Sequence, residues 1–559
     1  MRAEYRRPLA TRRPLNFAAA VIAAGPYDRA MPSLLALALL VLQSPQQPTP
    51  YDLVLRGGSI LDGTGREAIA ADVGIRAGRI AAIGSLQVAP GTPTLELGGL
   101  TVAPGFVDLH THVDAEIARR PLAENFLRMG VTTIITGNCG GSVPDIAAHL
   151  ARVDRGGVGV NYGTLVGHGT VRTAAMGSAD RAPDAAELAK MTDLVAAAMR
   201  AGAFGLSTGL IYVPGTYATT DELVALCRPV AAHGGIYASH MRYEGDRILD
   251  AIAETLQIGR DAGVPVHVSH IKCTGKPNHG RADEVLAVLR QARTQFRVTA
   301  DQYAYDASST GIDVLFPSAE LAVGRQAFAE RLGKDQEYRK SIHAALLRKM
   351  DEIGFGDFRH ARIAAAKGNA ELNGLLMPEA ARRRFGEDGR DAQANLAIDL
   401  LVAAAPTRVT MVYHGMSEAD VRTYLAEDWI ALASDAGVRN PAGEEKPHPR
   451  GSGNTARLLG RYVREQGVVS LPTAVRKLSA LPASIFGLQD RGTITVGAWA
   501  DLVVFDPATV IDRATYDDPL AAPEGIRWVL VNGIVAVAEG TVTGVRAGQV
   551  LRHRSKEVR

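Results

Sequence analysis

Two histidines separated by a single residue follow a short apolar run that begins at Val107. They are His110 and His112. Alternate side chains of a β-strand point to the same face, so both imidazoles would project together from the end of a strand. Such a pair can hold one metal ion between two nitrogen ligands. A surface strand can also hold two histidines by chance, so the interpretation depends on which other residues lie beside them.

Other residues able to bind a metal or transfer a proton also follow short apolar runs. They are Cys139, His240, His270 and Asp435. Histidine and cysteine are zinc ligands, and a carboxylate can act as a general base or acid. Each has an ordinary structural alternative: Cys139 could be a packed thiol in a turn, and Asp435 could be a turn residue before Gly437. Their recurrence at predicted strand ends favours one shared site.

The elements that would position these residues alternate along residues 104–487. Helical patterns lie between short strands, as at 184–201 and 247–262. The predicted strands span 132–136, 162–166, 203–206, 236–239, 266–269, 298–300, 409–412 and 430–433. Repeated β-α units of this kind predict an α/β fold with a (β/α)8 TIM-like barrel, whose active site lies where the strands end. The charged, helical stretch at about 325–398 interrupts the repeat and is predicted to be an insertion.

Both ends of the predicted barrel are flanked by alternating apolar and polar residues. Residues 50–103 and 488–552 contain such segments, at 51–56, 79–84 and 501–506 among others. Alternation with glycine breaks is typical of antiparallel strands. We therefore expect a small β-sandwich domain built from both chain ends.

Composition excludes several classes of protein. The 559 residues are 47% hydrophobic and 21% charged, which is ordinary for a globular protein of more than one domain. A net charge of +2 and 5% aromatic residues give no reason to expect nucleic acid as a partner. Three cysteines are too few for a disulfide framework. The oligomeric state stays open.

Residues 1–49 have the character of a targeting segment and linker. Paired arginines precede two apolar stretches, and the second, 34–42, is too short to span a bilayer but suits a signal sequence. We expect export to the periplasm or outside the cell, and no stable membrane span. The alternative is a cytoplasmic protein whose start codon is misplaced, so that residues 1–49 precede the true start.

Several longer runs resemble the amidohydrolase superfamily and, within it, the N-acyl-D-amino-acid deacylases (D-aminoacylases). The resemblance covers roughly residues 50–550. The matching runs include PGFVDLHTHVD (104–114), GVTTIITGNCGGS (130–142), ASHMRYEGD (238–246), VSHIKCTG (268–275), ASDAG (433–437) and HPRGSG (448–453). Together they are specific for the family and less specific for the substrate.

The resemblance implies a zinc-dependent hydrolase acting on linear amides. Cys139, His240 and His270 would hold one tight zinc site, leaving a fourth position for water. His110 and His112 would hold a weaker second site, which Cys139 could bridge. Asp435 would be the catalytic carboxylate. Most members of the superfamily bridge two metals with a carboxylated lysine, but the fourth strand, GAFGLS (202–207), has none.

The substrate implied is an N-acyl-D-amino acid, whose free carboxylate needs a counter-charge. The family positions near that group are Lys272, Arg450, Tyr212, Tyr303 and Ser309. Cationic and hydroxyl groups can all bind a carboxylate. The alternatives are a surface position for Arg450 and a packing role for Tyr303.

Two other functions are also compatible with the sequence. One is a cyclic-amide amidohydrolase of the dihydroorotase or hydantoinase kind, which the missing lysine disfavours. The other is a non-enzymatic protein that keeps the fold for binding or assembly. Such proteins usually lose metal ligands, and here every ligand type is present.

Overall fold

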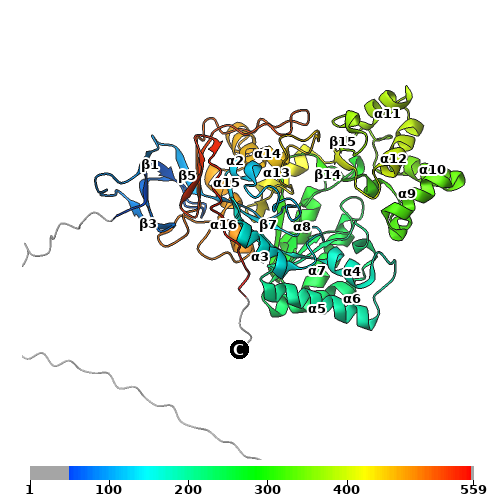
Figure 1. Cartoon of the computed structure of the whole chain (residues 1–559), viewed down its shortest axis with the longest axis horizontal. Helices are drawn as coiled ribbons and strands as arrows, with labels where there is room; N and C mark the ends of the chain where they lie inside the picture. Colours follow the sequence, from blue (N-terminus) through cyan, green and yellow to red (C-terminus); the bar gives the residue numbers. More distant parts are fainter. Residues whose placement is uncertain (1–49, 555–559) are drawn as a thin grey trace, which may run out of the picture. The chain divides into compact units, whose positions relative to one another are not determined.

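A computed structural model describes residues 50–554 as a mixed α/β protein (Figure 1). The predicted targeting segment at 1–49 lies outside the described residues. Within 50–554, no helix is both long and apolar enough to cross a membrane.

Parallel strands form the centre of the fold in two sheets. The smaller contains β6 (Phe106–Asp108), β7 (Val131–Thr136) and β8 (Asn161–Thr164). The larger has the order β17-β13-β12-β11-β10-β9, with β9 (Val166–Gly167), β10 (Gly205–Gly209), β11 (Ile236–His240), β12 (Val266–Val268), β13 (Val298–Gln302) and β17 (Ile430–Leu432). The sheets meet at both edges, because only Leu165 separates β8 from β9 and a parallel bridge joins Thr111 to Ala436.

Helices follow most of these strands along the chain. They include α3 (Ile146–Gly156), α4 (His168–Met176), α5 (Ala185–Ala201), α6 (Thr220–Ala232), α7 (Ile248–Ala262), α8 (Ala282–Arg293) and α13 (Glu418–Ala426). The predicted helices at 184–201 and 247–262 are confirmed as α5 and α7. The Asp184 side chain accepts a hydrogen bond from the Glu187 backbone N–H, which caps the first turn of α5. Strands such as β10 and β11 are buried along their whole length, as parallel strands covered by helices must be.

Strands from the two chain ends share one nine-stranded sheet. From the first end come β1 (Leu53–Ile60), β2 (Ile69–Arg76), β3 (Arg79–Gly84), β4 (Thr94–Glu96) and β5 (Thr101–Pro104), and from the other β18 (Leu502–Phe505), β19 (Ile526–Val531), β20 (Ile534–Ala538) and β21 (Thr541–Val542). Antiparallel pairing of β5 with β18 joins the two groups. Successive residues of β18 face opposite ways: Val504 packs with Val73 from β2, whereas Val503 joins the main core.

A separate lobe, residues 308–413, is inserted between β13 and β17. It contains an antiparallel sheet of β14 (Ser308–Gly311), β16 (Thr410–Tyr413) and β15 (Ala361–Ala365), with helices α9 (Arg325–Lys334), α10 (Gln336–Glu352), α11 (Met377–Phe385) and α12 (Arg390–Ala404) (Figure 1). Buried apolar residues such as Phe328, Leu346 and Met411 form the lobe's own core. The lobe contains the whole helical stretch expected at 325–398.

One predicted strand belongs to a different sheet. The run 409–412 was expected among the parallel strands, but it forms β16 at the centre of the antiparallel lobe sheet. A short apolar run has the same composition in either kind of sheet, so its sequence does not decide its partners. The first parallel strand is also shorter than expected. It ends at Asp108, so His110 and His112 lie in the segment beyond it.

After β17, the last parallel strand, the chain forms a second group of short helices before it reaches β18. They are α14 (Arg450–Arg457), α15 (Leu471–Leu478) and α16 (Ala480–Ile485), with α2 (Glu124–Arg128) packed against α14. A π-helical segment, Leu458–Glu465, follows α14 directly. The first residue of α14, Arg450, pairs with Asp435 in the segment that follows β17.

Candidate metal centre

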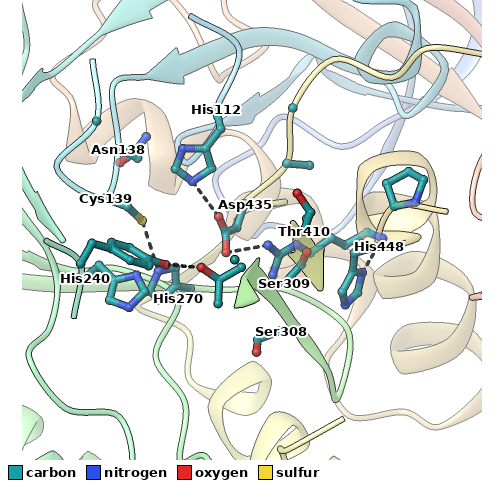
Figure 2. A pocket seen from close by; sticks show the side chains of 18 of the residues that line it. His112, Asn138, Cys139, His240, His270, Ser308, Ser309, Thr410, Asp435 and His448 are labelled. Carbon is teal, nitrogen blue, oxygen red and sulfur yellow. Dashed lines mark hydrogen bonds and ion pairs between the residues drawn. The ribbon is translucent and has the colours of Figure 1, made fainter. Parts of the chain in front are cut away.

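The segments after the parallel strands, together with the lobe, line a cavity of about 390 Å³. Five of the predicted metal-binding and catalytic residues line it: His112, Cys139, His240, His270 and Asp435. Figure 2 shows Cys139 grouped with His240 and His270, and a dashed line joins His112 to Asp435. His110 is fully buried directly behind them. Strand ends that are far apart in sequence thus converge on one pocket.

Cys139 stands at the centre of this convergence. Its Sγ lies 3.2 Å from His110 Nε2 and 3.4 Å from His270 Nε2. Two groups of possible ligand atoms, each within 4.8 Å of one another, share this cysteine: His110, His112, Cys139 and Asp435 in one, and Cys139, His240 and His270 in the other. One sulfur can therefore serve both groups.

The backbone is strained at three residues of the pocket. Cys139, His270 and Asp435 have φ values of 51°, 33° and 50°. This left-handed region costs a residue with a side chain about 1–3 kcal/mol, and such strain collects at functional sites. The turn after β7 also needs a glycine neighbour, because a Cβ at Gly209 would lie 2.2 Å from the Cys139 carbonyl oxygen. The fold holds these side chains where relaxed loops would not.

Neighbouring charges favour the ionised forms of the two acidic groups. Burial alone raises the pKa of the Cys139 thiol, but the His110 and His270 charges outweigh it, so the pKa lies well below its ordinary value. Burial likewise raises the pKa of Asp435, and the charges of Arg450 and His110 bring it well below its ordinary value. A thiolate and a carboxylate are the forms that bind metal or accept a proton.

The donor set fits a zinc ion. Both ring nitrogens of His240 are buried without a hydrogen-bond partner among residues 50–554, which is costly for a polar group unless something binds it. Thiolate and imidazole are soft and intermediate ligands that favour zinc over magnesium or calcium. Cys139, His240 and His270 together are the three-ligand arrangement that leaves a position open for water.

Glu244 supports the histidine ligands from behind. Its Oε1 lies 3.2 Å from His270 Nδ1 and 3.7 Å from His240 Nε2. His270 Nε2 is directed at Cys139, and its Nδ1 contacts both Glu244 Oε1 and Lys272 Nζ, the latter at 2.7 Å. These contacts fix the orientation of the imidazole ring. Lys272 Nζ donates to the same Oε1 at 2.5 Å. Burial raises the pKa of Glu244, but the Lys272 charge dominates and lowers it.

Asp301 has a similar relation to His110. Its Oδ2 lies 3.1 Å from His110 Nδ1 and 2.8 Å from His267 Nε2, and all three residues are buried. Its Oδ1 accepts a hydrogen bond from the His270 backbone N–H at 2.9 Å. One carboxylate therefore orients the side chain of His110 and the turn that contains His270.

Most of the predicted substrate contacts line the cavity. Lys272, Arg450, Tyr212 and Ser309 do so, but the lining does not include Tyr303. Tyr303 is fully buried, its hydroxyl directed at the Met416 sulfur, with the Arg450 guanidinium 4.5 Å from its ring centroid. Its place is beneath Arg450, so it supports that side chain and does not face the cavity.

Three charged residues that line the cavity were not predicted from the sequence: Glu244, Arg408 and Arg439. Glu244 follows His240 by four residues in HMRYE, and this spacing is the only local signal it offers. Arg408 precedes β16 in the lobe, and Arg439 lies in the irregular segment after β17. Nothing in the sequence around either arginine indicates a pocket.

Comparison with known proteins places this geometry in context. A family model described as "Amidohydrolase family" matches residues 94–537. The chain is 38% identical over 528 residues to a D-aminoacylase of Alcaligenes xylosoxydans xylosoxydans, covering 90% of this chain and 98% of the relative. It is also 38% identical over 524 residues to an N-acyl-D-glutamate deacylase of the same organism, covering 90% and 96%.

A solved structure agrees with these relatives. The N-acyl-D-glutamate deacylase of Bordetella bronchiseptica, complexed with zinc and a phosphonate that mimics the tetrahedral intermediate, is 35% identical. It matches with a TM-score of 0.76 over 90% of this chain and 100% of that one. The resemblance inferred from the short sequence runs is thereby confirmed, and the chain belongs to the amidohydrolase family.

Proposed function

We propose that this protein hydrolyses the amide bond of N-acyl-D-amino acids, releasing a carboxylic acid and a D-amino acid, with zinc as its cofactor. The single observation that supports this best is the convergence of Cys139, His240 and His270 with Asp435 on one cavity. The D configuration and the linear amide rest on the two curated relatives and the zinc-bound structure described above.

The metal would be held by Cys139, His240 and His270 as the tight site. His110 and His112, with Cys139 shared, would form a second and weaker site. When bound, zinc supplies Lewis acidity, which acidifies water and polarises an amide carbonyl. Glu244 and Asp301 fix the orientation of the histidine rings before any substrate arrives.

Asp435 is the proton carrier in this proposal. Its Oδ1 lies 2.9 Å from His112 Nε2, and its Oδ2 forms an ion pair with Arg450 Nη2 at 2.9 Å. Held between these partners, the carboxylate takes a proton from the attacking water. It then delivers that proton to the leaving nitrogen, so the amine departs neutral.

Lys272 and Arg450 would bind the free carboxylate of the substrate. Arg450 Nε and Nη1 have no hydrogen-bond partner among the described residues, so two donor nitrogens remain after its contact with Asp435. Lys272 is buried and its ammonium is held by Glu244 and by the His270 carbonyl oxygen. Tyr212 and Ser309 contribute hydroxyl groups to the same cavity.

The architecture that we propose follows from the strand pairing. The two parallel sheets, which meet at both edges, would form a closed (β/α)8 barrel, and the nine-stranded sheet would fold over its own core as a β-sandwich. The corresponding domains are residues 104–487 and residues 50–103 with 488–552. Export directed by residues 1–49 remains a prediction.

A substrate panel tests the proposed function. Release of amine is measured for N-acetyl-D- and N-acetyl-L-amino acids, for the same acids blocked as neutral amides, and for hydantoin and dihydroorotate. We expect hydrolysis of the D acids, with a roughly ten- to hundredfold loss when the carboxylate is blocked. Hydrolysis of the cyclic amides alone would contradict the proposal.

A further inference from the structure

We propose that Arg439 forms a second anion-binding subsite in the cavity, which receives the side-chain carboxylate of an acidic D-amino acid. The inference rests on the proposed function and goes one step beyond it, because it names the class of side chain. The substrate would be an N-acyl derivative of D-glutamate or D-aspartate, with two carboxylates instead of one.

The first support is the charge balance of the cavity. Four cationic side chains line it: Lys272, Arg408, Arg439 and Arg450. Lys272 is paired with Glu244 at 2.5 Å and Arg450 with Asp435 at 2.9 Å. Arg408 Nε lies 3.3 Å from the Asp313 carboxylate, which also binds Arg325. Of these four cations, Arg439 alone has no carboxylate of the described residues within 4.0 Å of its charged group.

The second support is the surroundings of that guanidinium. Arg439 Nη2 donates to the His448 carbonyl oxygen at 2.9 Å, and its Nε is buried without a hydrogen-bond partner. Burial lowers the pKa of Arg439 to about 10, with the charge of Arg450 adding to the effect, so the group still keeps its proton at neutral pH. Arg439 as a whole is half-buried, but its buried Nε without a partner is costly, and an anionic ligand would offset that cost.

The third support is that neighbouring residues fix the position of Arg439. A Cβ at Gly451 would lie 2.2 Å from Arg439 Nε and from Nη2, so the guanidinium lies directly on a glycine of α14. Asn125 forms hydrogen bonds with both residues. Its Oδ1 accepts from the Arg439 backbone N–H at 3.2 Å, and its Nδ2 donates to the Gly451 carbonyl oxygen at 2.8 Å. The arginine is therefore held at the cavity instead of extending into solvent.

The substrate class follows from counting the groups left free to bind an anion. An N-acyl amino acid with a neutral side chain brings one carboxylate, and the free Nε and Nη1 of Arg450 can donate hydrogen bonds to it. Arg439 adds a cation that only a second negative group would satisfy. Sequence identity does not choose between side chains, because the D-aminoacylase and the N-acyl-D-glutamate deacylase are equally similar at 38%. The unpaired arginine favours the acidic side chain.

The test compares each acidic substrate with its neutral isostere. Values of kcat/KM are measured for N-acetyl-D-glutamate and N-acetyl-D-glutamine, and for N-acetyl-D-aspartate and N-acetyl-D-asparagine. We expect the wild type to prefer at least one acid over its amide by roughly ten- to hundredfold, the effect of a charge-assisted contact. A wild type that prefers the amides or apolar side chains would overturn the inference.

Three variants locate the preference. Arg439→Gln should reduce it to within about threefold of unity while hydrolysis of N-acetyl-D-glutamine changes little. Gly451→Ala keeps the charge but displaces the guanidinium, so the preference should also fall. Arg408→Gln removes the same charge from a residue that already has a counter-ion, and the preference should persist. Loss of preference in Arg408→Gln alone would overturn the assignment to Arg439.

Two further comparisons distinguish failure of the proposed function from failure of the Arg439 subsite. If no N-acyl-D-amino acid is hydrolysed, the proposed function itself fails. If neutral substrates are hydrolysed with no acidic preference, only the Arg439 subsite fails. N-succinyl-D-leucine places the second carboxylate on the acyl group. If that substrate, and not N-acetyl-D-glutamate, depends on Arg439, the assignment to the amino-acid side chain is wrong. Thermal unfolding of each variant confirms that the fold is intact.

Discussion

The cavity has two walls of different origin. The strand-end wall, made of Cys139, His240, His270 and Asp435, comes from segments after parallel strands. The lobe wall, made of Ser308, Ser309, Thr310, Arg408 and Thr410, comes from the antiparallel sheet inserted between β13 and β17. The first wall contains a thiolate, imidazoles and strained backbone, whereas the second contains hydroxyl groups and one arginine without left-handed residues.

This difference separates chemistry from recognition. A metal centre needs fixed ligand positions, and segments anchored by a buried parallel sheet provide them. The contacts that distinguish one substrate from another need only modest binding energy, and an inserted lobe can supply them without disturbing the metal ligands. Changes in the strand-end wall should therefore abolish turnover, and changes in the lobe wall should alter only binding.

The largest effect is expected for Cys139→Ala. Because this thiolate is shared by both groups of ligands, its loss should remove bound zinc and reduce hydrolysis to background. Zinc content by mass spectrometry and turnover measure the two outcomes. The matched control is Cys273→Ala, a buried thiol 3.4 Å from the Tyr424 hydroxyl and outside the cavity lining, which should keep both zinc and activity. Normal zinc and turnover in Cys139→Ala would remove the cysteine from the centre.

The next effect is expected for Asp435→Asn. The amide keeps the shape of the side chain but cannot accept and deliver a proton, so kcat should fall at least about a hundredfold while zinc stays bound. Turnover and zinc content are measured on the same preparation. Wild-type kcat in this variant would exclude Asp435 as the proton carrier.

A smaller effect is expected for Glu244, which contacts the histidine ligands. Glu244→Gln removes the negative charge that holds His270 Nδ1, and zinc affinity should fall about tenfold, at the low end for residues that support metal ligands. Competition with a chelator measures the affinity. Glu222→Gln is a matched control, because that buried glutamate pairs with His168 at 2.8 Å outside the cavity lining. An equal loss of zinc affinity in both variants would indicate a general loss of stability.

The smallest effect is expected in the lobe wall. Thr310 Oγ1 donates to the Tyr212 hydroxyl at 2.9 Å, and Tyr212 in turn packs edge-on against His240. Thr310→Val preserves the shape and removes the hydrogen bond, which should raise KM roughly two- to tenfold and leave kcat and zinc unchanged. Steady-state kinetics separate the two constants. A fall in kcat or in zinc content would show that the two walls are not functionally separate.

The same division explains what sequence reasoning could predict. Cys139, His240, His270 and Asp435 each follow a short apolar run, and the ends of parallel strands meet at one edge of a sheet, so a local pattern was enough to bring them together. The helices α5 and α7 were equally visible from their helical sequence patterns.

The remaining features depend on contacts between distant segments. The position of Arg439 at the cavity depends on Gly451, which belongs to another element and lies against the guanidinium. The strand β16 was assigned to the wrong sheet because an apolar run does not specify its partners. Tyr303 was placed in the pocket by family position, whereas its neighbours turn its hydroxyl toward Met416. Tertiary packing decided each of these outcomes.

The central claim is that one zinc ion is held by residues from three strand ends. Anomalous diffraction at the zinc edge, from crystals of the zinc-loaded enzyme, tests it most directly. We predict a peak about 2.3 Å from Cys139 Sγ and about 2.0–2.1 Å from one ring nitrogen each of His240 and His270. A peak elsewhere in the molecule, or none in this cavity in an enzyme that is active with zinc, would contradict the account.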